Sequence, residues 1–301
     1  MGGDIRGILE ARARLFGGVR AFFAERGFME VSTPVAIPAN APEANIDALA
    51  VEGGRWFRTS PELHMKRLLA AGSGPIYQIA PCARKGERGA VHREEFLLLE
   101  WYRPGGDERE ILEDAKALVE ALARSFWGGE ATRRRGEVKL DARACAWKVR
   151  TVREAFLVAA GWDPVAEWDA DRFDLDLVDK VEPSLPKDHP VVLAEYPAAV
   201  AALAKKKEGD PRVARRWEMY WGGVELMNTF CELTDPVEQR RRFEEENETR
   251  ARRGAVPYPI DEDFLEALGR MPPSGGTALG LERLLMLLTG AEDLGGVRAL
   301  E

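Results

Sequence analysis

The sequence predicts one α/β (α+β) domain over residues 1–301, and three observations lead to this prediction. The chain is 45% hydrophobic and 31% charged, as is typical of a soluble globular protein with a sizeable core. Helical and strand-like hydrophobic patterns alternate along its length. No change in composition marks a linker or a second domain.

The first part of the chain contains two helix patterns and three strand patterns. Apolar residues at helical spacing predict a helix over 5–26, which Gly27 ends. A second helix is expected over 60–72, with Ser60 as its N-cap. The expected strands are FMEVSTP, IYQIAPCAR and EEFLLLEWY, of which the last two are joined by a polar loop.

The remaining elements follow from the same patterns. Helices are expected over 107–126 and in the polar segment PVEQRRRFEEENETRARRG. Residues 150–217 are expected to be mostly helical, with VVLAEY as one strand. The other expected strands are a short pair within RRRGEVKL, the segment GGVELMNTFCELTD, and the first half of GTALGLERLLMLLTG, whose second half is a helix.

Composition excludes several classes of protein. Cys82, Cys145 and Cys231 are odd in number and far apart, which favours reduced thiols in the cytoplasm. The chain has three histidines and neither CxxC nor HExxH, which argues against a zinc site. A net charge of −8 argues against a general nucleic-acid coat. No apolar run is long enough to cross a bilayer, and the N-terminus is not a signal peptide.

Glu100 is a single carboxylate in the otherwise apolar strand EEFLLLEWY. Because side chains alternate along a strand, Glu100 shares one face with Phe96, Leu98 and Tyr102. A buried carboxylate without a partner is strongly disfavoured, so Glu100 requires a cation. Either an internal arginine or lysine supplies it, or the cation is the ammonium group of a ligand that also contacts the Tyr102 hydroxyl.

The loop before this strand is rich in cations. It carries Arg84, Arg88, His92 and Arg93, and Phe96 follows on the face of Glu100. Guanidinium groups next to an aromatic ring form a workable clamp for a nucleoside triphosphate, with guanidinium on phosphate and ring on base. Charged hairpins are also common as solvated loops, so this pattern alone leaves both interpretations open.

Two acids in GGVELMNTFCELTD suggest a metal site. Glu225 and Glu232 flank Asn228, and oxygen ligands of this kind hold Mg²⁺ against phosphates. Their spacing of seven puts them on opposite faces of a regular strand, so joint ligation requires a bulge or bend near Leu226 to Asn228. The alternative is that both glutamates lie at strand edges and face water.

The segment GGTALGLERLLML predicts a glycine-rich strand followed by a helix with Arg283 in its first turn. A helix N-terminus beside a guanidinium group is an anion site, although capping is the commoner role of such a residue. Neither GxxxxGK[ST] nor GxGxxG occurs, so ATP would bind without a P-loop or Rossmann turn.

These segments resemble the three motifs of the class II aminoacyl-tRNA synthetases. RGFMEVSTP is similar to motif 1, the stretch from Arg84 through His92 to Phe96 to motif 2, and GTALGLER to motif 3. Within the class, TSPELHMKRLLAAG, HREEFLLLEWYRPG and ELMNTFCELTD resemble the lysyl subgroup, above all its short paralogues that ligate (R)-β-lysine to elongation factor P. As in those paralogues, a catalytic domain without an N-terminal anticodon-binding domain is expected.

The resemblance implies a mainly antiparallel sheet flanked by helices, a homodimer, and the use of ATP and Mg²⁺. It implies that Arg84 and Arg283 are catalytic, with Arg84 on the α-phosphate and Arg283 on the outer phosphates. The other implied ATP contacts are Glu87, His92, Phe96, Glu225 and Gly280. The implied Mg²⁺ ligands are Glu225 and Glu232. The implied substrate contacts are Ser60, Glu62, Glu100, Tyr102, Asn228, Phe230, Glu232 and Ala278.

The chain departs from the family pattern at a few positions. Motif 2 reads Arg-Lys-Gly from Arg84 where Arg-Asn-Glu is usual, and Glu87 stands one place late. The segment NTFCELTD replaces NGFHELTD. Ala278 stands where lysyl-tRNA synthetases tend to have glycine, and its methyl group is expected to discriminate between α- and β-amino acids.

The expected reaction is ATP-dependent activation of (R)-β-lysine, or lysine, to an acyl-adenylate and transfer to a lysine of elongation factor P in the cytoplasm. The net charge of −8 opposes a broad tRNA interface and favours a basic acceptor loop. The alternatives are an enzyme that charges tRNA or another carrier with α-lysine, and an inactive synthetase-like binding subunit. The presence of Arg84, Glu225, Glu232 and Arg283 argues against the inactive form.

Overall fold

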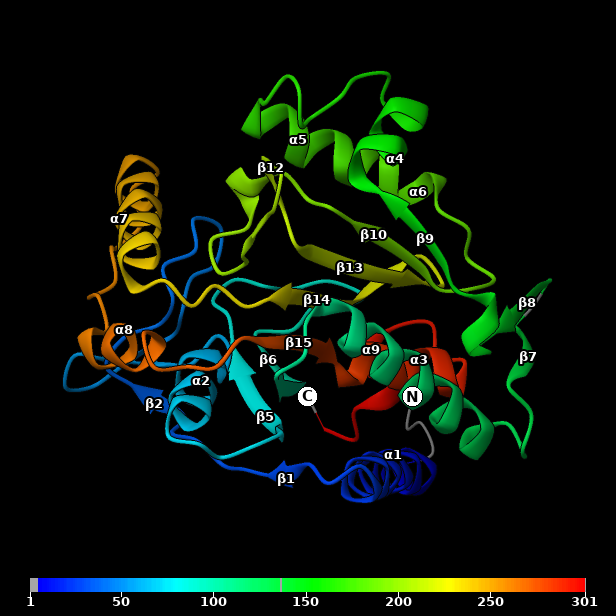
Figure 1. Ribbon diagram of the computed structural model, residues 1–301. Coiled ribbons are helices and arrows are strands. Elements are labelled where there is room, and N and C mark those ends of the chain that lie inside the picture. Colours follow the sequence, from blue (N-terminus) through cyan, green and yellow to red (C-terminus); the bar gives the residue numbers. More distant parts are fainter. Residues whose placement is uncertain (1–4, 136, 301) are drawn as a thin grey trace.

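The computed structural model describes residues 5–135 and 137–300, and an eight-stranded sheet runs through its centre (Figure 1). The strand order is β1-β5-β6-β15-β14-β13-β10-β9. The pairs β1–β5 and β9–β10 at the two edges are parallel, and all others are antiparallel. The expected fold, a mainly antiparallel sheet flanked by helices, is therefore confirmed.

The strands of this sheet vary from two to ten residues. They are β1 (Met29–Glu30), β5 (Ile76–Ala83), β6 (Glu95–Pro104), β9 (Lys148–Thr151), β10 (Val191–Ala194), β13 (Arg216–Trp221), β14 (Val224–Cys231) and β15 (Ser274–Gly280). Three small sheets lie outside it: β2 (Ala36–Ile37), β3 (Ala50–Val51) and β4 (Arg55–Phe57); β7 (Thr132–Arg135) and β8 (Val138–Asp141); and β11 (Lys206–Lys207) and β12 (Asp210–Ala214).

Three helices pack on one face of the large sheet: α1 (Ile5–Glu25), α3 (Glu108–Phe126) and α9 (Leu281–Thr289). Their apolar stripes enclose the largest core together with inward side chains such as Leu99 and Trp101. Leu99 and Trp101 are on the face opposite Glu100, as the alternation of side chains predicts. None of the described helices is both long and apolar enough to cross a membrane.

Two groups of helices flank the opposite face (Figure 1). One packs on β10 and β13, and the other packs near β5 and β6. The centre of this face, formed by β6, β15 and β14, is left open, and the main cavity lies there. The first group contains α4 (Val152–Ala159), α5 (Ala170–Asp176), a π-helical turn (Leu177–Val181) and α6 (Glu182–Ser184). The second group contains α2 (Glu62–Ala70), α7 (Pro236–Arg252) and α8 (Glu262–Leu268). Three 3₁₀ turns complete the structure: Ala144–Ala146, Ala198–Val200 and Leu294–Val297.

Most of the sequence-based elements are confirmed, including α1, α3, α7, the β5–β6 hairpin and the β15–α9 unit. The prediction of mostly helix over 150–217 is wrong in its second half, where β11, β12 and the start of β13 lie. β13 shows no alternation because nearly all its residues are buried, so its pattern does not indicate a strand. Helix α2 begins at Glu62 and Pro61 occupies the cap position, although Ser60 Oγ still accepts a hydrogen bond from the Glu62 amide at 3.0 Å.

Candidate active site

The open centre of the sheet holds a cavity of about 440 Å³. Its floor is made by β6, β14 and β15, and its walls come from α2, the loop over 84–94 and the first turn of α9. All fifteen residues predicted from the sequence as site residues line it: Ser60, Glu62, Arg84, Glu87, His92, Phe96, Glu100, Tyr102, Glu225, Asn228, Phe230, Glu232, Ala278, Gly280 and Arg283. The residues selected by side-chain alternation and by motif order therefore all lie around one cavity.

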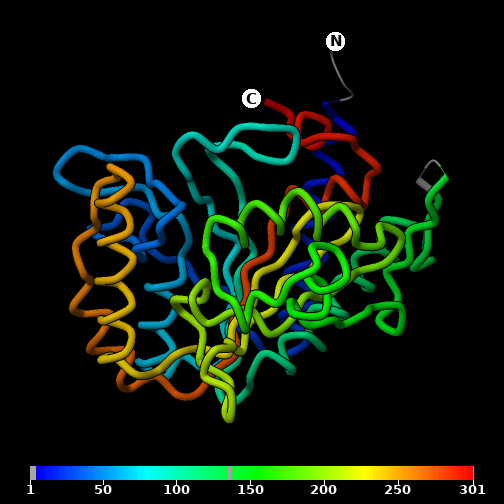
Figure 2. The backbone as a smooth tube through the Cα atoms, turned by 90° about the horizontal axis from the view of Figure 1, so that it is seen from above, coloured from blue at the N-terminus to red at the C-terminus, as the bar shows by residue number. Residues whose placement is uncertain are grey.

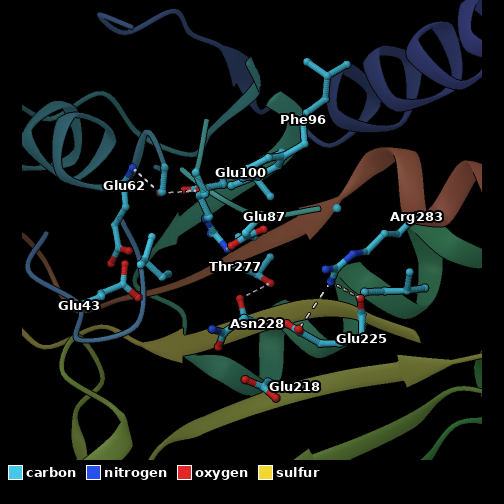
Figure 3. A pocket seen from close by; sticks show the side chains of 18 of the residues that line it. Glu43, Glu62, Glu87, Phe96, Glu100, Glu218, Glu225, Asn228, Thr277 and Arg283 are labelled. Atoms are coloured by element: carbon cyan, nitrogen blue, oxygen red, sulfur yellow. Dashed lines mark hydrogen bonds and ion pairs between the residues drawn. The ribbon is translucent and has the colours of Figure 1, made fainter. Parts of the chain in front are cut away.

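Glu100 lies on the cavity floor and is 1% exposed. Ser60 Oγ donates to Glu100 Oε1 at 2.6 Å, and the Tyr102 hydroxyl donates to Oε2 at 3.0 Å (Figure 3). Burial, reinforced by the charge of Glu62, raises the pKa of Glu100 to about 7 despite these hydrogen bonds. In the part of the chain that the structure describes, no arginine or lysine forms an ion pair with Glu100, so the internal salt bridge considered above is absent.

A second acidic group surrounds Lys66, a buried lysine on α2. Lys66 Nζ pairs with Glu62 one helical turn earlier and with Glu232 Oε2 at 2.6 Å. Burial opposes the charge of Lys66, but the two carboxylates outweigh it and raise the pKa of Lys66 above its usual value. Glu232 Oε1 has no hydrogen-bond partner among the described residues. It lies beside Gly276, where an added Cβ would be 2.2 Å from Glu232 Oε1 and 2.3 Å from the Tyr102 ring.

Strand β14 contains the bulge that the spacing of its acids requires. The register with β13 shifts between Met219 and Tyr220, which leaves Leu226 without a partner. Glu225, Asn228 and Glu232 therefore face the same cavity.

The distance between Glu225 and Glu232 nevertheless favours separate roles for them over the predicted joint ligation of one Mg²⁺. Six register steps separate them along β14, about 20 Å at the rise of a strand, which two glutamate side chains cannot span.

The acidic neighbour of Glu225 is Glu218 on β13. Glu225 is opposite Tyr220, so Glu218 is its diagonal neighbour across the two strands (Figure 3). Burial raises the pKa of Glu225 to about 7, and the charge of Glu218 adds to this effect, whereas Arg283 and Arg216 oppose it.

Arg216 joins this acidic pair to the middle of β14. Its guanidinium group pairs with Glu218, donates from Nε to Asn228 Oδ1 at 3.0 Å, and lies over the Phe230 ring at 5.7 Å. Ala278 is paired in register with Asn228 on one side and Glu100 on the other, so its methyl group lies between the two acidic regions.

Arg84 lies between the Phe96 ring and the Glu87 carboxylate. Its guanidinium carbon lies 5.1 Å from the centre of the Phe96 ring, and its Nη1 lies 3.6 Å from Glu87 Oε1. Arg84 Nε donates to the Thr59 carbonyl at 3.4 Å. Most of its guanidinium N–H groups thus remain directed to the cavity, which leaves them available to an anion.

Arg283, in contrast, is held firmly. It donates to the Val91 carbonyl at 3.1 Å and to the Glu225 carbonyl at 2.9 Å, and its Nη2 lies 2.7 Å from His92 Nε2. Burial lowers the pKa of His92, and the charge of Arg283 lowers it further. His92 is therefore neutral near pH 7, with Nε2 as the acceptor. Gly280, the N-cap of α9, leaves space for the Arg283 side chain, whose Cδ would lie 3.3 Å from an added Cβ.

The sequence analysis missed five cavity residues, Glu43, Arg216, Glu218, Gly276 and Thr277, and also Lys66, which pairs with the cavity acids Glu62 and Glu232. One of them carried a usable signal, because Lys66 stands four residues after Glu62 on a predicted helix, the spacing of an ion pair. Arg216 and Glu218 were missed because their strand was not recognised.

The family comparison covers nearly the whole chain. A family model described as tRNA synthetases class II (D, K and N) matches residues 2–300.

Two curated relatives match at similar levels. An elongation factor P--(R)-beta-lysine ligase of Edwardsiella ictaluri (strain 93-146) is 40% identical over 304 residues. A protein of the same name from Hamiltonella defensa subsp. Acyrthosiphon pisum (strain 5AT) is 37% identical over 302 residues. Each alignment covers 96% of this chain and 93% of the relative.

Proposed function

The chain belongs to the class II tRNA synthetases of the D, K and N group, and we propose that it activates a lysine-type amino acid with ATP and transfers it to a lysine of elongation factor P. The substrate is (R)-β-lysine or lysine. The observation that carries this proposal is the acidic cavity floor, where two hydroxyls donate to Glu100 and no arginine or lysine of the described residues forms an ion pair with it.

The tail ammonium of the substrate binds at Glu100. The Tyr102 hydroxyl and the unpaired Oε1 of Glu232 border the same space, next to Gly276. An ammonium group has three donors, and these three acceptors suit it. A side chain without a positive charge would leave Glu100 buried and unpaired, which is the basis of the proposed selectivity.

ATP binds at the other end of the cavity. Phe96 offers a ring face for adenine, and Arg84 offers free N–H groups to the α-phosphate and to the substrate carboxylate. Arg283 adds a fixed positive charge for the outer phosphates at the start of α9. His92, being neutral, orients Arg283 and does not act as a second cation.

Glu225 on β14 fits a Mg²⁺ ion when ATP is bound. It offers carboxylate oxygens next to the phosphate-binding arginines, and Mg²⁺ favours one or two carboxylates combined with phosphate oxygens. Its neighbour Glu218 pairs with Arg216 and accepts hydrogen bonds from the Tyr196 and Tyr220 hydroxyls. The described residues hold no group of three or more metal ligands, so the phosphates are needed to complete the site. The ion would neutralise charge on the phosphates.

The reaction proceeds in two steps without a side-chain nucleophile. A substrate carboxylate oxygen attacks the α-phosphorus, and the bond to pyrophosphate breaks. The acceptor amine then attacks the carbonyl carbon of the adenylate, and AMP leaves with the electron pair of the broken C–O bond. Arg84 stabilises charge at the α-phosphate, and the ammonium-binding acids fix the position of the carboxylate.

A homodimer is part of this proposal. Ile5 and Leu9 on α1 and Met29 on the edge strand β1 are 52%, 53% and 59% exposed. Exposed apolar side chains beside an unpaired strand edge suit an interface with a second copy of the chain.

The test combines two assays on the purified protein. ATP–pyrophosphate exchange that depends on Mg²⁺ and on (R)-β-lysine or α-lysine is expected, with norleucine inactive. Incubation with ATP, (R)-β-lysine and elongation factor P is expected to increase the mass of elongation factor P. Label on total tRNA with unmodified elongation factor P would replace this acceptor with tRNA, and no exchange with any diamino acid would favour a binding subunit.

A further inference from the structure

Glu43 is an acid in the loop between β2 and β3, and it lies at the rim of the cavity. Figure 3 shows its carboxyl group pointing toward that of Glu62, which comes from the first turn of α2. The Glu62 side chain also pairs with Lys66 on its other side. Two acids from separate elements thus face each other at one end of the cavity.

The backbone around Glu43 is fixed by helix α7, which runs alongside this loop (Figures 1 and 2). The buried guanidinium group of Arg250 donates to the Glu43 carbonyl at 2.8 Å and to the Ile46 carbonyl at 2.7 Å. The Ala44 amide donates to Glu246 Oε2 at 2.8 Å. The position of the Glu43 backbone is therefore fixed, because these three hydrogen bonds connect the loop to helix α7.

The two facing acids lack a counter-charge between them. In the described residues, no arginine or lysine lies within ion-pair distance of Glu43. Burial at the rim, with the charges of Glu62 and Glu246, raises the pKa of Glu43 to about 7, whereas Arg84 opposes the rise. Facing carboxylates in such a place either share a proton or hold a cation.

We propose that Glu43 is a specificity-determining residue that, together with Glu62, binds the second ammonium group of the substrate, the one nearest the carboxyl group being activated. This inference rests on the function proposed above. The far end of the cavity, at Glu100, takes the tail ammonium. Arg84 and Arg216, whose charges act on Glu43, mark the end where the carboxylate must lie.

The proposal predicts which substrates need Glu43. The diamino acids α-lysine and (R)-β-lysine carry an ammonium group near the carboxylate, whereas 6-aminohexanoic acid keeps the tail ammonium and lacks the other. Binding of the second ammonium displaces the proton that Glu43 holds in the ligand-free protein. Glu43→Gln removes one of the two carboxylates, so only diamino acids lose affinity.

The experiment measures ATP–pyrophosphate exchange for wild type and Glu43→Gln, with 6-aminohexanoic acid as a competitive inhibitor. The KM for α-lysine and (R)-β-lysine is expected to rise at least about 10-fold, while the inhibition constant of 6-aminohexanoic acid is unchanged. Glu52→Gln is the matched control, because it removes the same charge from an exposed position near the same loop. It is expected to behave as wild type.

Each outcome separates this inference from the proposed function. An unchanged KM in Glu43→Gln overturns the inference while the active wild type upholds the function. An equal rise in the KM of the diamino acids and in the inhibition constant of 6-aminohexanoic acid also overturns the inference. Glu43 would then affect the shape of the cavity without binding the second ammonium group. Absence of exchange in the wild type overturns the proposed function itself and the inference that rests on it.

Discussion

Replacing Glu100 with glutamine is expected to stabilise the ligand-free protein above neutral pH and to weaken substrate binding. Burial and the charge of Glu62 raise the pKa of Glu100 from 4.5 to about 7. Each pKa unit is worth about 1.4 kcal/mol, so ionisation of Glu100 at pH 8 costs the folded state about 3 kcal/mol. The glutamine side chain of the variant does not ionise and avoids this cost. It loses about 1 kcal/mol of hydrogen-bond energy, since its amide has one acceptor oxygen for the two hydroxyls of Ser60 and Tyr102.

The sign of the pH dependence follows from the raised pKa. An acid of this kind contributes stability that is fully present below about pH 4.5 and is lost as the pH rises through about 7. The wild type loses about 2 kcal/mol of this contribution between pH 5.5 and 8, whereas the variant has none to lose. A net gain of about 2 kcal/mol corresponds to a Tm about 4 °C higher for the variant at pH 8. Little difference is expected at pH 5.5.

Thermal unfolding of the ligand-free protein at the two pH values tests this prediction. Glu95→Gln, at the exposed end of the same strand, is the control and is expected to leave the Tm unchanged at both. Binding measurements at pH 8 complete the test. The affinity of Glu100→Gln for α-lysine is expected to fall at least about 30-fold, because a buried ammonium loses its charge partner, while the affinity for norleucine is unchanged.

Two results would refute this reasoning. A Tm of the variant that is lowered equally at pH 5.5 and pH 8 would mean that the Glu100 carboxylate stabilises the folded protein. An unchanged preference for α-lysine over norleucine would mean that the ammonium group binds elsewhere. The wild type supplies a further check, since its own affinity for α-lysine is expected to rise between pH 6 and 8 as Glu100 ionises.

Two other substitutions test the geometry of the site. Gly276→Ala is expected to reduce lysine-dependent exchange at least about 100-fold, because the new Cβ would displace both Glu232 Oε1, at 2.2 Å, and the Tyr102 ring, at 2.3 Å; wild-type exchange would contradict the placement of the tail ammonium. Glu225→Gln is expected to raise the Mg²⁺ concentration required for exchange, whereas Glu232→Gln is expected to raise the KM for lysine at unchanged Mg²⁺ dependence; the reverse pattern would support Glu232 as a metal ligand.

The parts of this site that the sequence could predict depend on local periodicity. The face of Glu100 follows from alternation along β6, and the need for a bulge in β14 follows from the odd spacing of Glu225 and Glu232. The structure bears out both. Periodicity also locates the start of α9, where Arg283 lies. These features depend on residues within one element, so they can be derived without knowing which strands are neighbours.

The parts that could not be predicted depend on sheet order and on loops. Glu218 becomes the neighbour of Glu225 only because β13 pairs with β14. The buried pattern of β13 resembles neither an alternating strand nor an amphipathic helix. Glu43 reaches the cavity only because Arg250, more than 200 positions later in the chain, binds its carbonyl. Such long-range contacts cannot be inferred from the periodicity of the sequence.

Among the described residues, Lys66 is the only cation that forms an ion pair with any of the three acids Glu62, Glu100 and Glu232. Glu62, Glu100 and Glu232 bring three negative charges, and Lys66 brings one positive charge. Glu43 adds a fourth acid, whose proton the second ammonium group displaces. The two ammonium groups of a diamino acid therefore each meet acids, one at each end of the cavity. A second internal lysine would neutralise Glu100 permanently, so the cavity would bind a neutral side chain as well as a charged one.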